Sequence, residues 1–131
     1  IEMFVTRDDK VIINEIAPRV HNSGHHTLQS SKTSQFEQHL RAILGLDLGG
    51  TELIHPTIMY NILGSEEFSG KYKLEKISVE NLYLKMYGKA ESKPQRKLGH
   101  FNLVDVKDVL GVDGLLKSLE TIKKQIKLIK I

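Results

Sequence analysis

Cysteine is absent from this sequence of 131 residues, and aromatic residues make up only 6% of it. The absence of cysteine excludes disulfides, thiolate metal sites and cysteine nucleophiles, and it fits a reducing compartment. No run of about 18 apolar residues and no signal-peptide pattern is present, so neither a membrane span nor secretion is predicted. We therefore expect a cytoplasmic protein without a membrane partner.

Charge of one sign is not in large excess either. The 19 lysine and arginine residues against 16 aspartate and glutamate residues leave a formal net charge of +3. The basic residues concentrate in segments 85–97 and 117–130, which favours local anion sites or a solvated helix face over a nucleic-acid surface. With 40% hydrophobic residues, the chain can bury one or two small cores.

The chain begins inside a strand pattern. Residues 1–6 and 10–16 are rich in β-branched and apolar side chains around the polar pair Asp8-Asp9, which predicts a β-hairpin. A hairpin that starts at the first residue leaves an open sheet edge. We therefore expect this sequence to be part of a longer protein whose other strands complete the sheet.

Two carboxylates face each other in this predicted hairpin. With Asp8 and Asp9 as the central turn residues, Glu2 lies opposite Glu15, where like charges repel. A bridging Mg²⁺ would offset this repulsion, and Asn14 could add a neutral oxygen beside it. The alternatives are a register that differs by one residue, or two solvated side chains on an open face of the hairpin.

The most informative stretch runs from Asn14 to Thr27, where the second predicted strand ends. It crowds a carboxylate, an arginine and three histidines (His21, His25 and His26) into one connection, as loops at functional sites do. A zinc site is the alternative reading of the histidines, but no acidic or cysteine partner follows at a familiar spacing. We interpret the stretch as a candidate active-site loop.

The remaining segments predict an α+β fold. Helical spacing of apolar residues predicts a helix over 33–44, with Thr33 as its cap and Gly45 at its end. A final helix is predicted to begin at Asp113, with apolar residues through position 129 and lysines on a solvated face. Strands are predicted over 57–63, 81–87 and 98–104, with a loop over 64–74 and a hairpin between the last two strands.

The loop between those last two strands, residues 88–97, is a second candidate site. A hairpin would gather its four cations at one end: Lys89, Lys93, Arg96 and Lys97. Such a cluster suits a phosphate, because arginine presents a bidentate fork and lysine a point charge. The alternative is an ordinary polar hairpin tip.

Four segments carry a resemblance to a known family. They are Glu2–Thr6, the run Asn-Glu-Ile-Ala-Pro-Arg-Val-His-Asn-Ser-Gly-His from position 14, Thr33–Ala42, and the hairpin with Tyr87-Gly88-Lys89 and Arg96–His100. Together they closely resemble the C-terminal part of the 5-(carboxyamino)imidazole ribonucleotide synthases, ATP-grasp enzymes also called phosphoribosylaminoimidazole carboxylase ATPase subunits. The formate-dependent glycinamide ribonucleotide transformylases are similar too, but Asp-Thr-Gly usually replaces the Asn22–His25 element there.

The resemblance implies a fold and a reaction. Residues 1–56 would be the C-terminal part of an ATP-grasp domain, an antiparallel sheet with a packed helix, and residues 57–131 a small antiparallel β unit closed by a C-terminal helix. The family reaction converts ATP, bicarbonate and 5-aminoimidazole ribonucleotide to 5-carboxyaminoimidazole ribonucleotide, ADP and phosphate, through carboxyphosphate and with Mg²⁺. A homodimer is expected for the full-length protein, and this portion alone is expected to be inactive.

The resemblance also implies roles for individual residues. Glu2 and Glu15 would bind Mg²⁺, and Asn14 and Glu15 would be the cofactor-binding residues. Arg19 and His21 would face bicarbonate and the aminoimidazole. Two further groups would bind substrate: Asn22, Ser23, Gly24 and His25 by shaping that pocket, and Lys89, Arg96 and Lys97 by holding the ribonucleotide, chiefly its phosphate.

One part of the basic hairpin departs from the family pattern. The family commonly has Arg-Pro-Gly-Arg-Lys where this chain has Lys93-Pro94-Gln95-Arg96-Lys97. Lys93 lacks the bidentate fork of arginine, and Gln95 lacks the conformational freedom of glycine at the tip. We therefore expect the phosphate geometry to differ in detail.

A basic binding module is the alternative function from another class. It would use the 85–97 hairpin and the C-terminal helix to contact nucleic acid or an acidic partner. Only Tyr83 and Tyr87 lie near the basic loop, so few rings are available for base stacking. The ligase interpretation, which involves no nucleic acid, is favoured.

Overall fold

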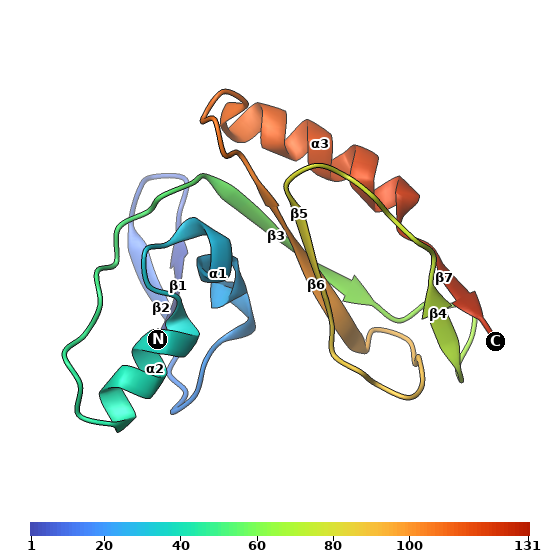
Figure 1. Ribbon diagram of the computed structural model, residues 1–131, viewed down its shortest axis with the longest axis horizontal. Coiled ribbons are helices and arrows are strands. Elements are labelled where there is room, and N and C mark those ends of the chain that lie inside the picture. The colour runs from blue at the N-terminus through green and yellow to red at the C-terminus, as the bar shows by residue number, and fades with distance from the viewer. The chain divides into compact units, whose positions relative to one another are not determined.

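A computed structural model describes all of residues 1–131, which form two compact units, residues 1–54 and 55–131. Each unit combines antiparallel strands with helices, which confirms the predicted α+β class (Figure 1). No helix is both long enough and apolar enough to cross a membrane.

The first unit opens with the predicted hairpin. Strands β1 (Glu2–Val5) and β2 (Val11–Glu15) are antiparallel. Asp9 has a φ of 58°, and its N–H donates to the Thr6 carbonyl at 3.1 Å. The connection is therefore longer than the predicted two-residue turn, with Asp9 in the left-handed position that closes such loops.

The register of this hairpin differs from the prediction in its inner part and agrees at its open end. The inner pairs are Val5–Val11, Phe4–Ile12 and Met3–Ile13, one residue away from the predicted register. A register shift at the next position then places Glu2 opposite Glu15. The predicted carboxylate pair is thus confirmed, because a bulge cancels the error in the turn.

Three helical segments follow the hairpin: η1 (Asn22–His26), α1 (Thr27–Ser30) and α2 (Gln35–Ile43). The part of the candidate loop from residue 22 is therefore helical. The predicted cap Thr33 is wrong by one residue, because the Ser34 hydroxyl accepts from the Glu37 N–H at 3.3 Å. Thr33 itself is buried, with 8% of its surface exposed.

Residues 1–54 bury no large apolar side chain. On β1 and β2, for example, Met3 is 54% exposed and Val5 is 71% exposed. Polar hydrogen bonds rather than an apolar core therefore hold the candidate loop in place within this unit.

The second unit is built on a three-stranded sheet with strand order β3-β6-β5 (Figure 1). Its strands are β3 (Thr57–Leu63), β5 (Leu82–Met86) and β6 (Lys97–Val104), and the predicted hairpin between the last two is confirmed. Helix α3 (Gly111–Gln125) contributes to the core, whose buried residues are Ile62, Phe101, Leu103, Leu115 and Ile122.

The C-terminal end of this unit differs from the prediction in two ways. Helix α3 ends at Gln125, and Leu128–Lys130 form strand β7, which pairs with β4 (Tyr72–Leu74) in the segment predicted to be a loop. A strand partner decides between helix and strand here, because a short apolar run fits both patterns. The predicted cap Asp113 is also wrong, since it lies inside the first turn of α3.

Candidate active site

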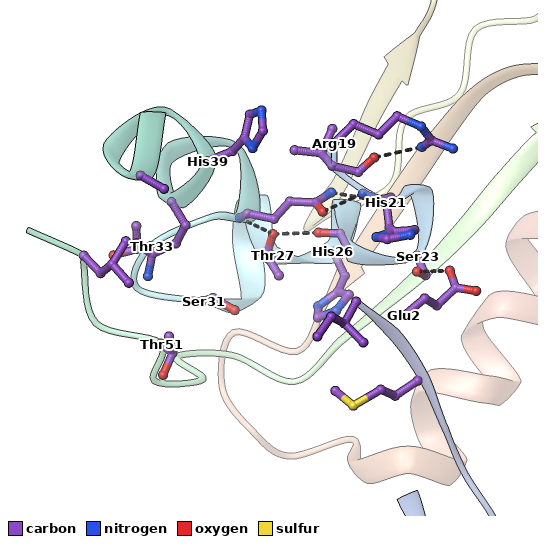
Figure 2. A pocket seen from close by; sticks show the side chains of 18 of the residues that line it. Glu2, Arg19, His21, Ser23, His26, Thr27, Ser31, Thr33, His39 and Thr51 are labelled. Atoms are coloured by element: carbon purple, nitrogen blue, oxygen red, sulfur yellow. Dashed lines mark hydrogen bonds between the residues drawn. The ribbon is translucent and has the colours of Figure 1, made fainter. Parts of the chain in front are cut away.

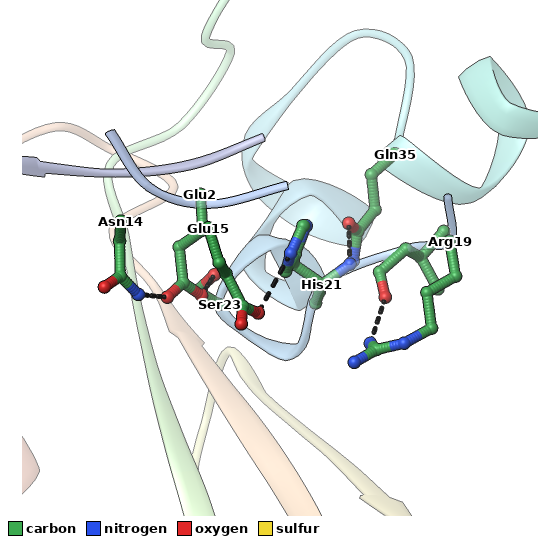
Figure 3. Close-up of polar contacts among 8 residues, drawn as sticks. Glu2, Asn14, Glu15, Arg19, His21, Ser23 and Gln35 are labelled. Carbon is green, nitrogen blue, oxygen red and sulfur yellow. Dashed lines mark hydrogen bonds and ion pairs between the residues drawn. The ribbon is translucent and has the colours of Figure 1, made fainter. Parts of the chain in front are cut away.

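The first feature of the site is a hydrogen-bonded carboxylate at the open end of the hairpin. Glu2 accepts from the Asn14 side-chain amide at 2.6 Å and from the Ser23 hydroxyl at 2.5 Å (Figure 3). Asn14 is the extra residue of the bulge, which turns its side chain toward Glu2. The Glu2 carboxylate thus binds a residue 12 positions and a residue 21 positions further along the sequence.

The second feature is a contact between Glu15 and His21. The His21 Nε2 lies 3.1 Å from Glu15 Oε1, without the alignment of a hydrogen bond (Figure 3). The His21 side chain is only 9% exposed, whereas that of Glu15 is 54% exposed. The buried imidazole therefore lies against a carboxylate whose remaining surface is open to solvent.

Arg19 does not join these contacts. Its guanidinium donates to the carbonyl of the next residue, Val20, at 3.0 Å, and the side chain is exposed (Figure 3). The structure brings together Glu2, Asn14, Glu15, His21 and Ser23, and leaves the Arg19 guanidinium outside this cluster.

Gln35, at the start of α2, ties down the loop that carries the histidines. Its Oε1 accepts from the His21 N–H at 3.0 Å, and its Nε2 donates to the His21 carbonyl at 2.6 Å (Figure 3). Nε2 also lies 2.8 Å from His25 Nδ1. A Cβ on Gly24 would lie 2.6 Å from Gln35 Oε1, so this arrangement needs glycine there.

His26 faces a different partner from those of His21 and His25. Its Nδ1 lies 2.8 Å from the Ser30 hydroxyl, and Ser30 is fully buried. Burial lowers the pKa of His26 below its ordinary value of 6.5, because desolvation disfavours the charged ring. At neutral pH this ring is therefore uncharged.

A pocket of about 970 Å³ opens beside these groups within the first unit (Figure 2). Glu2, Arg19, His21, Ser23 and His26 all line it. The pocket thus joins a carboxylate, a guanidinium and imidazoles on one concave surface, as sites for charged ligands do.

The residues that could hold a metal ion are the hard oxygen ligands at the hairpin end. Glu2, Glu15 and Asn14 offer carboxylate and amide oxygens, which suit Mg²⁺. No group of three or more His, Cys, Asp or Glu side chains could hold a metal ion by itself. This donor set fits Mg²⁺, which usually takes one or two carboxylates and completes its shell with phosphate and water.

The second unit carries the other predicted site residues. Lys89 and Lys97 are exposed, and Arg96 is half-buried, with its guanidinium donating to the Glu91 carbonyl at 3.3 Å. Gln95 has a φ of 59°, and its amide donates to Glu66. The position at which the resemblance leads us to expect glycine is therefore left-handed in this chain, and Gln95 adopts that conformation.

Sequence analysis missed Gln35, whose side chain hydrogen-bonds the His21 backbone and lies 2.8 Å from His25 Nδ1. The only signal was its place directly after Ser34, a good N-cap residue, since side chains in a first helical turn point back toward the preceding connection. Nothing in the pattern indicated which loop it would meet.

Each of the two units matches a known protein domain. Residues 1–36 match the ATP-grasp domain, and residues 57–109 match the phosphoribosylaminoimidazole carboxylase C-terminal domain. The N5-carboxyaminoimidazole ribonucleotide synthase of Bacillus subtilis is 48% identical over 104 residues, which are 79% of this chain and 27% of the relative. The chain therefore spans about a quarter of the length of this relative.

Solved structures agree with these matches. The N5-carboxyaminoimidazole ribonucleotide synthetase of Thermotoga maritima superposes with a TM-score of 0.85 at 45% identity, covering 98% of this chain and 36% of that one. The enzyme of Aspergillus clavatus, solved with ADP and 5-aminoimidazole ribonucleotide, gives a TM-score of 0.71 at 30% identity, covering 92% of this chain and 34% of that one.

The matched domains and the fold define a part of an ATP-grasp protein, homologous to the ATP-grasp ligases. Within that class the chain belongs to the N5-carboxyaminoimidazole ribonucleotide synthase family, and it corresponds to the C-terminal portion of those proteins.

Proposed function

We propose that this chain is the C-terminal portion of a cytoplasmic, homodimeric ligase that carboxylates 5-aminoimidazole ribonucleotide at the expense of ATP. The products would be 5-carboxyaminoimidazole ribonucleotide, ADP and phosphate, formed through carboxyphosphate. The observation that carries the proposal is the presence in one chain of an ATP-grasp segment and of this carboxylase's C-terminal domain, at 48% identity to a synthase. The basic binding module has no comparable support.

The hairpin end is the proposed metal and phosphate site. Glu2 and Glu15 would hold Mg²⁺, and Asn14 would orient Glu2 through its amide. Mg²⁺, when bound, supplies charge neutralisation for the phosphoryl group in transfer. The short contacts of Glu2 to Asn14 and Ser23 support this role, because they hold the Glu2 carboxylate opposite Glu15 although the two negative charges repel each other.

The candidate loop is the proposed site for bicarbonate and for the reactive carboxyphosphate. Arg19 is exposed on the pocket wall, so its guanidinium is available for an anion. The His21 ring lies against Glu15, and the His21 backbone is hydrogen-bonded to the Gln35 side chain. The imidazole is therefore oriented before substrate arrives. Ser23 and Gly24 line that pocket, and their neighbours Asn22 and His25 in η1 would help to shape its wall.

The basic hairpin is the proposed ribonucleotide site. Lys89, Arg96 and Lys97 would bind the phosphate, as the cationic character of residues 88–97 suggests. The left-handed Gln95 supports this, because the tip keeps the backbone conformation that glycine would favour there.

The proposal is tested with the full-length protein that contains these residues. Bicarbonate-dependent release of phosphate from ATP, in the presence of 5-aminoimidazole ribonucleotide, is the expected result. The ribonucleotide should be consumed in a one-to-one ratio with ATP. ATP turnover that depends on neither bicarbonate nor the ribonucleotide would contradict the proposal. Salt-sensitive binding of RNA or DNA, without ATP turnover, would favour the basic binding module.

A further inference from the structure

We propose that Gln35 is a positioning residue of the candidate active site, and that it holds His25 as the tautomer whose proton is on Nε2. Gln35 would act on the reaction by holding the two histidines in place. The catalytic consequence rests on the proposed function, whereas the tautomer assignment rests on the hydrogen bonds alone.

The orientation of the Gln35 amide follows from the backbone of His21. The His21 N–H can only donate, and it lies 3.0 Å from Oε1. The His21 carbonyl can only accept, and it lies 2.6 Å from Nε2. Exchanging the oxygen and nitrogen would oppose two donors and two acceptors, so only one orientation satisfies both groups.

This orientation determines the state of His25. An amide nitrogen has two hydrogens, and one of them is used by the His21 carbonyl. The other points to His25 Nδ1, which lies 2.8 Å from Nε2 of Gln35. Nδ1 must therefore accept, so it carries no proton, and the proton of the neutral ring is on Nε2.

Three further contacts hold the start of α2 against the loop. The Gln35 N–H donates to the Thr27 hydroxyl at 2.9 Å, and that hydroxyl donates to the Gly24 carbonyl at 2.6 Å. The His25 ring also packs on Phe36, with 5.1 Å between ring centroids. The start of α2 therefore determines both the path of the loop and the orientation of the ring.

A ring with its proton on Nε2 offers a donor at the atom farthest from the backbone. The Gln35 amide thus makes His25 a donor without giving it a charge. His25 is not among the residues that line the pocket, so the Gln35 side chain reaches the substrate site through His21, which lines the pocket and whose backbone it holds.

Gln38, on the same helix, also hydrogen-bonds a backbone through its side-chain amide, and it supplies a matched control. Gln38 donates through Nε2 to the Gly49 carbonyl at 2.6 Å and accepts at Oε1 from the Gly49 N–H at 2.9 Å. It repeats the backbone contacts of Gln35 without a histidine. Gln38→Met therefore removes the same kind of hydrogen bonds and leaves the partners of His25 in place.

The experiment records two-bond ¹⁵N–¹H correlation spectra of the full-length protein labelled in histidine. In the unsubstituted protein, His25 Nδ1 is expected at the chemical shift of an unprotonated nitrogen. Gln35→Glu, which can only accept, should place a proton on Nδ1. Gln35→Met should leave both tautomers populated, and Gln38→Met should leave the His25 signals unchanged.

Kinetics of the same variants give the second readout. Gln35→Met is expected to lower kcat by about 10- to 100-fold, as the loss of supporting hydrogen bonds does at other sites, with little change in the KM for ATP. A protonated Nδ1 in the unsubstituted protein, or unchanged His25 signals in Gln35→Met, would overturn the proposal. The spectrum of the unsubstituted protein decides the tautomer even where a variant does not fold.

The two proposals fail in different ways. A protein without carboxylating activity would still show the Nε2–H tautomer of His25 if the inference about Gln35 is correct. An active enzyme with a protonated His25 Nδ1 would retain the proposed function and lose the inference about Gln35.

Discussion

Glu2 and Glu15 lie opposite each other on β1 and β2 because Asn14 is inserted between two registers. Without that bulge, the inner pairs Met3–Ile13 and Phe4–Ile12 would continue to place Asn14 opposite Glu2. The bulge instead gives Glu2 two neighbours, the Glu15 carboxylate across the strands and the Asn14 amide at 2.6 Å. Bulges commonly re-aim side chains in this way next to active sites.

The first prediction concerns this carboxylate pair. Glu15→Gln removes one negative charge and should lower Mg²⁺-dependent ATP turnover of the full-length protein by about 100-fold or more, since a bound metal contributes several kcal/mol to phosphoryl transfer. The measurement is turnover against Mg²⁺ concentration. Glu37→Gln is the matched control, because Glu37 is exposed on α2 and pairs with Arg41 at 2.8 Å. Equal Mg²⁺ dependence in both variants would exclude Glu15 as a ligand.

The second prediction concerns the basic hairpin. Arg96→Ala should raise the KM for 5-aminoimidazole ribonucleotide by about 10- to 100-fold, because a hydrogen bond to a charged group contributes about 1.5–3 kcal/mol. The KM for ATP should stay the same. Lys117→Ala removes one positive charge from the exposed face of α3 and serves as control. A comparable rise in both variants would indicate a general charge effect in place of a phosphate site.

The third prediction concerns the left-handed residue at the hairpin tip. Gln95→Gly should stabilise the protein by about 0.5–1 kcal/mol, because glycine adopts a positive φ without the steric cost of a Cβ, while one exposed hydrogen bond is lost. Urea denaturation measures the change. Glu66→Ala removes the partner of Gln95 and keeps the backbone strain, so it should not stabilise. A destabilised Gln95→Gly variant would show that the contact to Glu66 outweighs the strain.

The fourth prediction concerns Asp105, which is buried just before α3. Burial works against its ionisation, but backbone N–H groups, including that of Leu110 at 2.7 Å and that of Val109 at 3.2 Å, outweigh it and lower the pKa of Asp105 below its usual 3.8. A lowered carboxyl pKa stabilises the fold above the unfolded-state pKa, and this contribution is lost as the pH falls through the folded-state pKa.

Asp105→Asn should therefore lower the Tm at pH 7, and its difference from the unsubstituted protein should shrink as the pH falls below about 4. Thermal unfolding followed by circular dichroism measures both. Asp113→Asn, at the position that the sequence predicted as the cap, is the control and should change the Tm little. A larger effect at Asp113 than at Asp105 would contradict the stabilising role of Asp105.

Several elements could be predicted from the sequence because their signals are local. Residues 57–63 form the predicted strand, and residues 82–86 and 97–104 form the predicted hairpin. Strand runs bounded by glycine and polar residues specify such elements without help from distant parts of the chain. The family resemblance is equally local, since short motifs carry it.

The errors occurred where a distant partner decides the structure. The segment Leu128–Lys130 is apolar enough to continue a helix, but pairing with Tyr72–Leu74 makes it a strand. The pairing of Glu2 with Glu15 was predicted from a two-residue turn that does not form. A bulge at the other end of the hairpin shifts the register by one residue and restores this pairing. Asp105, outside the helix, accepts from the backbone N–H groups of Val109 and Leu110 directly before α3.

By itself the sequence determined the α+β class, the family, and the residue types that crowd the loop from Asn14 to Thr27. Only the tertiary structure decided how those residues are held. Gln35 lies 14 positions beyond His21, and the bulge at Asn14 depends on pairing across two strands. Such hydrogen bonds depend on the distance and direction between two groups in space, and the pattern of residues along the chain does not specify these.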